Sequence, residues 1–356
     1  MDRALRRGRV VARLHELELD ALLVTRLPNV RYLTGYTGSN GQVVVGREAS
    51  VFFTDGRYIA QSEHEVPDLD RVIYASDFPS YFRKACGDLG VRRVGFEAAG
   101  VTYKLYRQLE ALDGVEISPV EDEVERLRWV KEPEELALIE RAQEITDAAF
   151  TETLPKLAEG VSEREIALEL EWSMLRGGAE DVAFDSIVAF GESAAEPHHH
   201  PGERMLARGE LVKLDFGALY EGYHSDMTRT VSFGEPSTEL RELYDLVRRS
   251  QQAGVDAVRS GIEGRDADRA SRGVIEAAGY GERFSHGLGH GVGLEIHEGP
   301  TLRSNSDEVL PVGAVVTVEP GVYLPGRAGV RIEDMVEVTE GGCRVIPKST
   351  KELVVL

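Results

Sequence analysis

The sequence predicts a small α/β domain followed by a larger α+β domain whose two halves resemble each other. The chain of 356 residues is long enough for about two domains. Helix-like and strand-like segments alternate in the first part of the chain, as in α/β folds. In the second part, Leu211–Gly217 resembles Val315–Gly321. Each is an apolar run with one carboxylate, and glycine follows that carboxylate two residues later.

We expect the first domain to span residues 1–122. Its first helix is predicted over Val10–Leu19, where apolar residues recur at helical spacing among charged ones. Five short apolar runs then predict strands, and Asp55-Gly56 is typical of a turn. The five runs are residues 20–25, 41–46, 50–54, 72–75 and 94–96.

The second domain is expected to span residues 123–356. Its first helix is predicted to start at Pro133, because proline and acidic residues favour the first helical turn. This helix should end before Gly160, and a capping box from Ser162 to Glu165 should start the next one. Two further helices are predicted over residues 238–260 and 266–278.

Each half of the repeat carries a second carboxylate in a second strand-like run. A tight turn centred on Tyr220 and Glu221 would place Asp215 directly opposite Asp226. A turn centred on Gly326 would place Glu319 directly opposite Glu333. Paired carboxylates repel each other unless a cation or a shared proton lies between them.

The four carboxylates lie in otherwise apolar runs, where an unpartnered buried charge costs several kcal/mol. The plainer interpretation makes each a solvated strand residue. We favour a site for divalent metal, since oxygen-rich donors with one imidazole suit Mn²⁺, Fe²⁺, Co²⁺ or Zn²⁺. Histidines cluster in the same part of the chain, at positions 198, 199, 200, 224, 286, 290 and 297.

Composition excludes several function classes. Lys and Arg number 41 against 62 Asp and Glu, a net charge of −21, so nucleic acids and anionic membrane surfaces are unfavourable partners. The two cysteines, Cys86 and Cys343, form no disulfide framework or zinc-finger spacing. No apolar run is long enough for a signal peptide or a transmembrane helix. We therefore expect a cytoplasmic protein without membrane or nucleic-acid partners.

These residues resemble the pita-bread metallopeptidases, which include aminopeptidase P, prolidase and methionine aminopeptidase, and their non-metal relative creatinase. The resemblance covers nearly the whole chain. The pieces that match are Asp215-Phe-Gly, Ser225-Asp-Met-Thr-Arg229, His286-Gly-Leu-Gly-His290, His297-Glu298, Glu319-Pro-Gly and Arg331-Ile-Glu333. Asn29–Gly35, Gly38–Gly41 and Thr54–Tyr58 resemble the creatinase-type amino-terminal domain. The resemblance implies a pita-bread catalytic domain with a pseudo-twofold repeat.

The resemblance also implies two divalent metal ions, most readily Mn²⁺, with Co²⁺ or Zn²⁺ as alternatives. Asp226 and Glu333 would bridge both ions and Asp215 would hold one of them. His290 and Glu319 would hold the other. Water activated by the metals would be the nucleophile, and Glu319 would also shuttle the proton.

Five residues are implied as catalytic: His198, His286, His297, Glu319 and Arg331. His297 would stabilise the tetrahedral intermediate, and His198 would contact the substrate near the scissile bond. His286 would line the proline side, and Arg331 would orient glutamate or substrate carbonyl groups. The family usually has glycine after the Pro-His pair, whereas His199 and His200 follow here; they could be idle loop residues. His224 could support the site or simply pack.

The implied function is that of an Xaa-Pro aminopeptidase, a homodimer that removes the first residue from peptides with proline in second position. The nearest alternative is an Xaa-Pro dipeptidase, or prolidase, which needs a group that binds the product carboxylate. Arg303, Arg327 and Arg331 are candidates for that group. More distant alternatives are a non-peptidic amide hydrolase and an inactive binding scaffold, although the complete ligand set argues against the scaffold.

Overall fold

The computed structural model describes residues 1–356, which form two compact units, Met1–Arg128 and Trp129–Leu356. A six-stranded mixed sheet in the order β4-β3-β2-β1-β5-β6 forms the centre of the first unit. Strand β2 pairs antiparallel with β1 and β3, while the other pairs in this sheet are parallel. Its strands are β1 (Ala21–Val24), β2 (Gln42–Gly46), β3 (Ser50–Asp55), β4 (Asp70–Tyr74), β5 (Arg93–Glu97) and β6 (Glu116–Val120).

The five predicted strands of this unit are therefore confirmed, but its helices are only partly predicted. Helix α1 (Arg3–Glu16) begins before the predicted start, because the Asp2 carboxylate accepts the Leu5 N–H at 2.9 Å and caps the helix. Short helices of this unit show no clear period in the sequence. They are α2 (Leu27–Thr34), η1 (Gly56–Tyr58), α3 (Ile59–Glu65), α4 (Phe78–Leu89) and α5 (Tyr103–Glu110), with α6 (Glu125–Trp129) at its end.

The second unit contains the four predicted long helices. They are α7 (Pro133–Thr153), α8 (Glu163–Arg176), α9 (Thr238–Ala257) and α10 (Gly264–Ala277). The capping box is confirmed, since the Ser162 N–H donates to Glu165 at 2.8 Å and the Glu165 N–H donates to the Ser162 hydroxyl at 3.2 Å. Three short 3₁₀ helices complete the set: η2 (Leu154–Lys156), η3 (Gly191–Ala195) and η4 (Gly281–Arg283).

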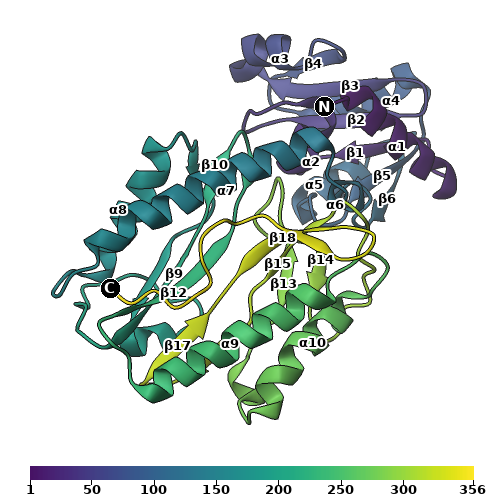
Figure 1. The fold of residues 1–356 in the computed structure, drawn as a ribbon. Helices are drawn as coiled ribbons and strands as arrows, with labels where there is room; N and C mark the ends of the chain where they lie inside the picture. The colour runs from purple at the N-terminus through teal and green to yellow at the C-terminus, as the bar shows by residue number, and fades with distance from the viewer. The chain divides into compact units, whose positions relative to one another are not determined.

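The strands of the second unit lie between the two helix pairs. They are β7 (Asp181–Val182), β8 (Ile187–Phe190), β9 (Glu210–Phe216), β10 (Ala218–Tyr220), β11 (Tyr223–His224), β12 (Met227–Phe233), β13 (Gly289–Gly291), β14 (Glu298–Leu302), β15 (Val315–Val318), β16 (Gly321–Leu324), β17 (Ala328–Arg331), β18 (Asp334–Val338) and β19 (Cys343–Val345). Figure 1 shows α7 and α8 on one flank of these strands and α9 with α10 on the other.

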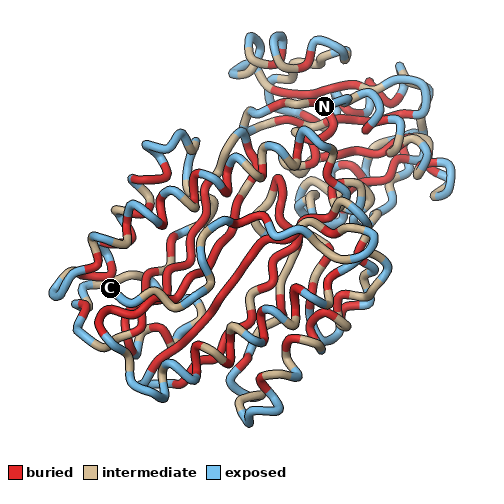
Figure 2. The backbone as a smooth tube through the Cα atoms, in the orientation of Figure 1, coloured by how far each residue is buried: buried red, intermediate tan, exposed pale blue.

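This arrangement confirms two similar halves. In one, α7 and α8 pack on the sheet β12-β9-β8; in the other, α9 and α10 pack on the sheet β14-β13-β15-β18-β19. Each half has its own apolar core, and Figure 2 shows that the central strands are buried along most of their length. No helix in the structure combines the length and the apolar character needed to cross a bilayer.

One of the two predicted carboxylate registers is correct. Val318 faces Asp334 in the β15–β18 pair, and Gly321 faces Arg331 in the β16–β17 pair. Both pairs have the register that a turn centred on Gly326 predicts. That register brings Glu319 opposite Glu333.

The other predicted register is wrong. Asp215 faces Thr228 rather than Asp226. The turn is centred on Glu221 and Gly222, which both have positive φ (45° and 79°), as the tight hairpin turn that suits twisted strands requires. Asp226 is therefore a diagonal neighbour of Asp215 on the same face of the hairpin.

Candidate active site

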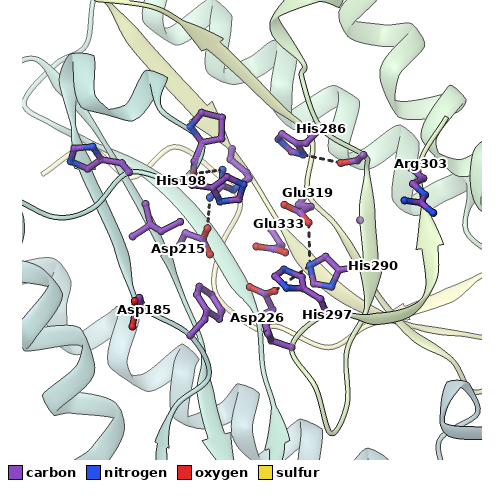
Figure 3. Close-up of a pocket in the computed structure, with 18 of the residues that line it drawn as sticks. Asp185, His198, Asp215, Asp226, His286, His290, His297, Arg303, Glu319 and Glu333 are labelled. Carbon is purple, nitrogen blue, oxygen red and sulfur yellow. Dashed lines mark hydrogen bonds and ion pairs between the residues drawn. The ribbon is translucent and has the colours of Figure 1, made fainter. Parts of the chain in front are cut away.

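The predicted site residues surround one cavity of about 430 Å³ in the second unit (Figure 3). Strands from both halves supply its wall. The residues lining it include all nine that the sequence analysis singled out as metal ligands or catalytic groups: His198, Asp215, Asp226, His286, His290, His297, Glu319, Arg331 and Glu333. Arg303 lines it as well.

Three side chains in this cavity offer donors to a common point. Asp226, His290 and Glu333 each present one ligand atom, and these atoms all lie within 4.8 Å of one another. His290 Nδ1 lies 3.0 Å from the Gly291 carbonyl oxygen and donates to it, which leaves Nε2 free to act as a ligand. Nε2 is 3.6 Å from Asp226 and 3.4 Å from Glu319. This donor set fits a divalent metal ion.

The electrostatics of the carboxylates also favour a cation. Burial and the neighbouring charge of Glu333 raise the pKa of Asp226 well above its usual range. Burial and the charges of Glu319 and Asp215 likewise raise the pKa of Glu333. Burial opposes ionisation of Glu319 too, but its hydrogen bond with His290 and the nearby positive charge, including that of Arg331, together outweigh burial and lower its pKa to about 2. Two carboxylates thus resist ionisation here unless a positive charge joins them.

Arg331 holds Asp215 in place. Its guanidinium forms an ion pair with the Asp215 carboxylate and donates to the Thr228 hydroxyl at 3.1 Å. It also donates to the Tyr323 hydroxyl at 2.7 Å and to the Pro197 carbonyl at 3.2 Å. Arg331 thus orients a carboxylate and a backbone carbonyl of the chain itself, so its donors are occupied before any substrate enters.

The ring of His286 is fixed as a neutral imidazole. Nδ1 donates to the Gly287 carbonyl at 2.8 Å, and Nε2 accepts from the Tyr323 hydroxyl at 2.8 Å. Burial is the main reason that the pKa of His286 is lowered. This geometry suits a wall of the cavity better than a proton donor.

His297 and His198 are available to a ligand. The ring of His297 packs edge to face on that of His290, with centroids 4.4 Å apart. Burial and the neighbouring His290 lower the pKa of His297, which keeps it neutral. The charge of His198 contributes to lowering the pKa of both His286 and His297, so the three imidazoles form one cluster.

Charges are distributed unevenly around the cavity. Figure 3 shows Asp185, Asp215 and Asp226 on one side and Arg303 on the opposite side. Arg303 directly follows β14 and is exposed, and its guanidinium forms no ion pair or hydrogen bond. Arg327 lies outside the cavity lining and pairs with Glu239 at the surface.

Several residues at the site were not predicted. Tyr323 and Thr228 orient Arg331, and Thr228 donates to Glu333 at 2.7 Å. Lys213 is fully buried, and its basic side chain inside the apolar run Leu211–Phe216 was a signal that could have revealed it. His224 lies outside the cavity lining, with Nδ1 3.0 Å from the Gly293 carbonyl oxygen.

The chain belongs to metallopeptidase family M24, whose family model matches residues 137–340. Residues 6–130 match the model of the creatinase/prolidase N-terminal domain. The Xaa-Pro dipeptidase structure from Bacillus anthracis is 41% identical with a TM-score of 0.97, and all of each chain is covered. The X-Pro aminopeptidase structure from Thermotoga maritima MSB8 is 37% identical with a TM-score of 0.89, covering 97% of this chain and 100% of that one. The curated Xaa-Pro dipeptidase of Pyrococcus horikoshii is 36% identical over 340 residues, which is 94% of this chain and 95% of the relative.

These similarities confirm the pita-bread metallopeptidase fold and its creatinase-type amino-terminal domain. They make the protein a hydrolase of a proline-specific peptidase family. Among the relatives named above, dipeptidases outnumber the aminopeptidase, so the alternative weighed from the sequence fits better than the aminopeptidase first favoured.

Proposed function

We propose that this protein is an Xaa-Pro dipeptidase, which hydrolyses the bond before proline in dipeptides. The observation that carries this proposal is the unpartnered guanidinium of Arg303 at the cavity, opposite the carboxylates. A dipeptide is a zwitterion, with an ammonium group at one end and a carboxylate at the other. The carboxylate-rich side suits the ammonium group, and a guanidinium binds a carboxylate through two parallel hydrogen bonds.

Arg303 is favoured over the other two arginines considered from the sequence. The guanidinium N–H groups of Arg331 already donate to Asp215, Tyr323, Thr228 and the Pro197 carbonyl. Arg327 pairs with Glu239 away from the cavity. Arg303 alone of the three both lines the cavity and retains free donors.

In this proposal Asp215, Asp226, His290, Glu319 and Glu333 hold two divalent metal ions. When bound, the ions supply Lewis-acid polarisation of the scissile carbonyl and lower the pKa of water. Mn²⁺ is our first choice, with Co²⁺ or Zn²⁺ as alternatives, because the donor set is mainly oxygen with one imidazole. The proposal also includes a homodimer, for which sedimentation velocity is the direct test.

The remaining steps belong to the side chains. The ionised Glu319 accepts a proton from the attacking water and passes it to the prolyl nitrogen, which has no hydrogen of its own. His297 and His198 donate to the carbonyl oxygen as negative charge develops on it. His286 forms the wall beside the proline ring.

A second candidate is an Xaa-Pro aminopeptidase, which accepts longer peptides. The Thermotoga maritima relative, named an X-Pro aminopeptidase, favours it. In that case Arg303 would contact a peptide carbonyl or solvent. The effect of replacing Arg303 on activity would then be the same whether or not the carboxyl end of the substrate is charged.

The test compares an Xaa-Pro dipeptide with the same dipeptide whose carboxylate is an amide. We expect wild type to prefer the free carboxylate by at least about tenfold in kcat/KM, because a charge-assisted hydrogen bond contributes about 1.5–3 kcal/mol. Arg303→Gln should abolish this preference, mainly through KM, whereas the matched surface variant Arg327→Gln should retain it. Equal use of both substrates by wild type would overturn the dipeptidase proposal.

A further inference from the structure

We propose that Lys213 and Glu163 are positioning residues that clamp the segment 194–202 from two sides and thereby fix His198 in the cavity. The inference rests on the proposed role of His198 in peptide hydrolysis. It assigns a function to a buried lysine and a buried glutamate that lie outside the proposed metal-ligand set.

Lys213 holds the start of the segment. Its side chain extends from β9 and is fully buried, and its Nζ donates to the carbonyl oxygens of Glu196 at 2.6 Å, Ala194 at 3.3 Å and Pro197 at 3.4 Å. It forms no ion pair with a carboxylate. Burying a lysine is costly, and an apolar residue would serve a buried strand better. The hydrogen bonds of this amine go to the residues directly before His198.

Two further contacts hold the same stretch of backbone. Arg331 donates to the Pro197 carbonyl at 3.2 Å. The segment also lies directly against Gly329 in β17. A Cβ at this position would lie 1.8 Å from the Ala194 carbonyl oxygen, so only glycine allows this contact. The backbone before His198 is therefore restrained by hydrogen bonds from the Lys213 amine and the Arg331 guanidinium and by close packing.

Glu163 holds the end of the segment. It lies in the first turn of α8, is 1% exposed, and its Oε1 accepts the Phe190 N–H at 2.9 Å. Its Oε2 accepts the Gly202 N–H at 3.1 Å and contacts His199 Nε2 at 2.8 Å. His199 Nδ1 contacts Glu196 at 2.7 Å, which ties both ends of the segment together. His199 thus has a structural role beside His198, which the sequence left open.

The segment leaves His198 itself unrestrained by side-chain bonds. His198 is exposed to the cavity and has no hydrogen-bond partner, so the position of its imidazole depends on the backbone that carries it. Misplacing a reacting group by about 1 Å can cost about 10²-fold in rate. Loosening either anchor should therefore lower kcat without removing a group that touches substrate.

The test is a double-mutant cycle with Lys213→Met, Glu163→Gln and His198→Ala in the Mn²⁺-loaded enzyme. We expect each anchor variant alone to lower kcat about 10- to 100-fold, with KM changed far less and Mn²⁺ affinity unchanged within about twofold. On the His198→Ala background the anchor variants should cause no further loss. The surface controls Lys156→Met and Glu169→Gln, which remove partners of an exposed ion pair, should behave as wild type.

Two outcomes would overturn the inference. Additive losses on the His198→Ala background would mean that the anchors act elsewhere. A fall in Mn²⁺ affinity that matches the fall in activity would mean that Lys213 acts through its neighbour Asp215. Glu163→Gln keeps the test decisive if Lys213→Met does not fold, because Glu163 lies on a different element.

Hydrogen exchange separates this inference from the proposed function. We expect the hydrogen-bonded amides of the segment, those of Glu196 and Gly202, to exchange at least about tenfold faster in either anchor variant, with β9 unchanged. If wild type cleaves no Xaa-Pro peptide but this acceleration is seen, the proposed function fails and the clamp stands. Unchanged exchange in the segment would disprove the clamp whatever the enzyme hydrolyses.

Discussion

Asp226 and Glu333 are both buried in the cavity wall, and burial raises the pKa of each in the metal-free protein. The charge of Glu333 adds to the shift of Asp226, and the charges of Glu319 and Asp215 add to that of Glu333. A folded state with raised carboxyl pKa values retains protons that the unfolded chain has released. Stability of the metal-free protein should therefore fall as pH rises above the ordinary carboxyl range. Asp226→Asn removes one of the two charges, which should make this decline shallower.

Urea unfolding in EDTA at several pH values between 4.5 and 7.5 measures this effect. We expect Asp226→Asn to be more stable than wild type at the upper end by about 1 kcal/mol, or about 2–4 °C in Tm for a domain of this size. The surface variant Glu169→Gln serves as the control. Parallel pH dependences in wild type and Asp226→Asn would contradict the assigned repulsion.

The Asp226→Asn substitution, which should stabilise the metal-free protein, should destabilise the protein relative to wild type once metal is present. Free Mn²⁺ at about 100 times its Kd should stabilise wild type by about 2.7 kcal/mol, which is about 5–10 °C in Tm. Asp226→Asn should lose most of this gain and at least about 10³-fold of the activity, because a carboxylate of the proposed ligand set is gone. Calorimetric titration with Mn²⁺ checks it, and unchanged affinity would remove Asp226 from the ligand set.

Individual site residues could be predicted from the sequence where the residue acts through the chemistry of its own side chain. The carboxylates and histidines lining the cavity could be identified because charged and ligating residues stand out in apolar or glycine-rich runs. Lys213, Tyr323 and Glu163 could not be assigned, since their roles depend on backbone atoms of segments remote in the sequence. The order of residues along the chain does not indicate which carbonyl a buried amine will contact.

Strand β13 depends on glycine to reach its neighbours. A Cβ on Gly289 would lie 2.0 Å from the Thr317 carbonyl oxygen of β15, and one on Gly291 would lie 2.1 Å from that of Gly299. Close approach of these backbones brings His290, between the two glycines, up to Glu319. Glycine is required at these two positions because any side chain would clash with the neighbouring backbone.

Two alanine substitutions should therefore have opposite signs. Gly289→Ala should destabilise the protein by about 2 kcal/mol or more, because backbone atoms must move apart. Gly273→Ala, inside α10 with nothing within 4 Å of the added Cβ, should stabilise it by about 0.5–1 kcal/mol. Denaturant unfolding of both variants is the measurement, and equal effects would contradict this account of β13.

Registers between strands show where sequence reasoning succeeds and fails. The Glu319–Glu333 pairing was predictable because Pro325-Gly326 marks the turn and Gly326 has the positive φ expected there. The Asp215–Asp226 pairing failed because Glu221 also takes a positive φ, which moves the turn by one residue. A shift of one residue at the turn displaces the opposite strand by two, so the facing pair changes while the face is kept.

For the whole molecule, the class of fold could be predicted from the internal repeat and the two carboxylate pairs. The identity of the substrate could not. Relatives named as a dipeptidase and as an aminopeptidase share the fold, so the fold alone does not distinguish the two activities. In the proposed binding mode the carboxyl end of the substrate meets Arg303, which lines the cavity and which no pattern in the sequence distinguishes from other surface arginines.

The most direct test of the dipeptidase proposal is hydrolysis of two peptides by the Mn²⁺-loaded wild-type enzyme, Xaa-Pro and Xaa-Pro-Yaa with the same first residue, followed by quantifying the released amino acid. A dipeptidase with Arg303 at the carboxylate should cleave the dipeptide at least about tenfold more efficiently, because the longer chain moves its carboxylate away from the guanidinium. Equal or faster cleavage of the tripeptide would contradict the account and make the protein an Xaa-Pro aminopeptidase.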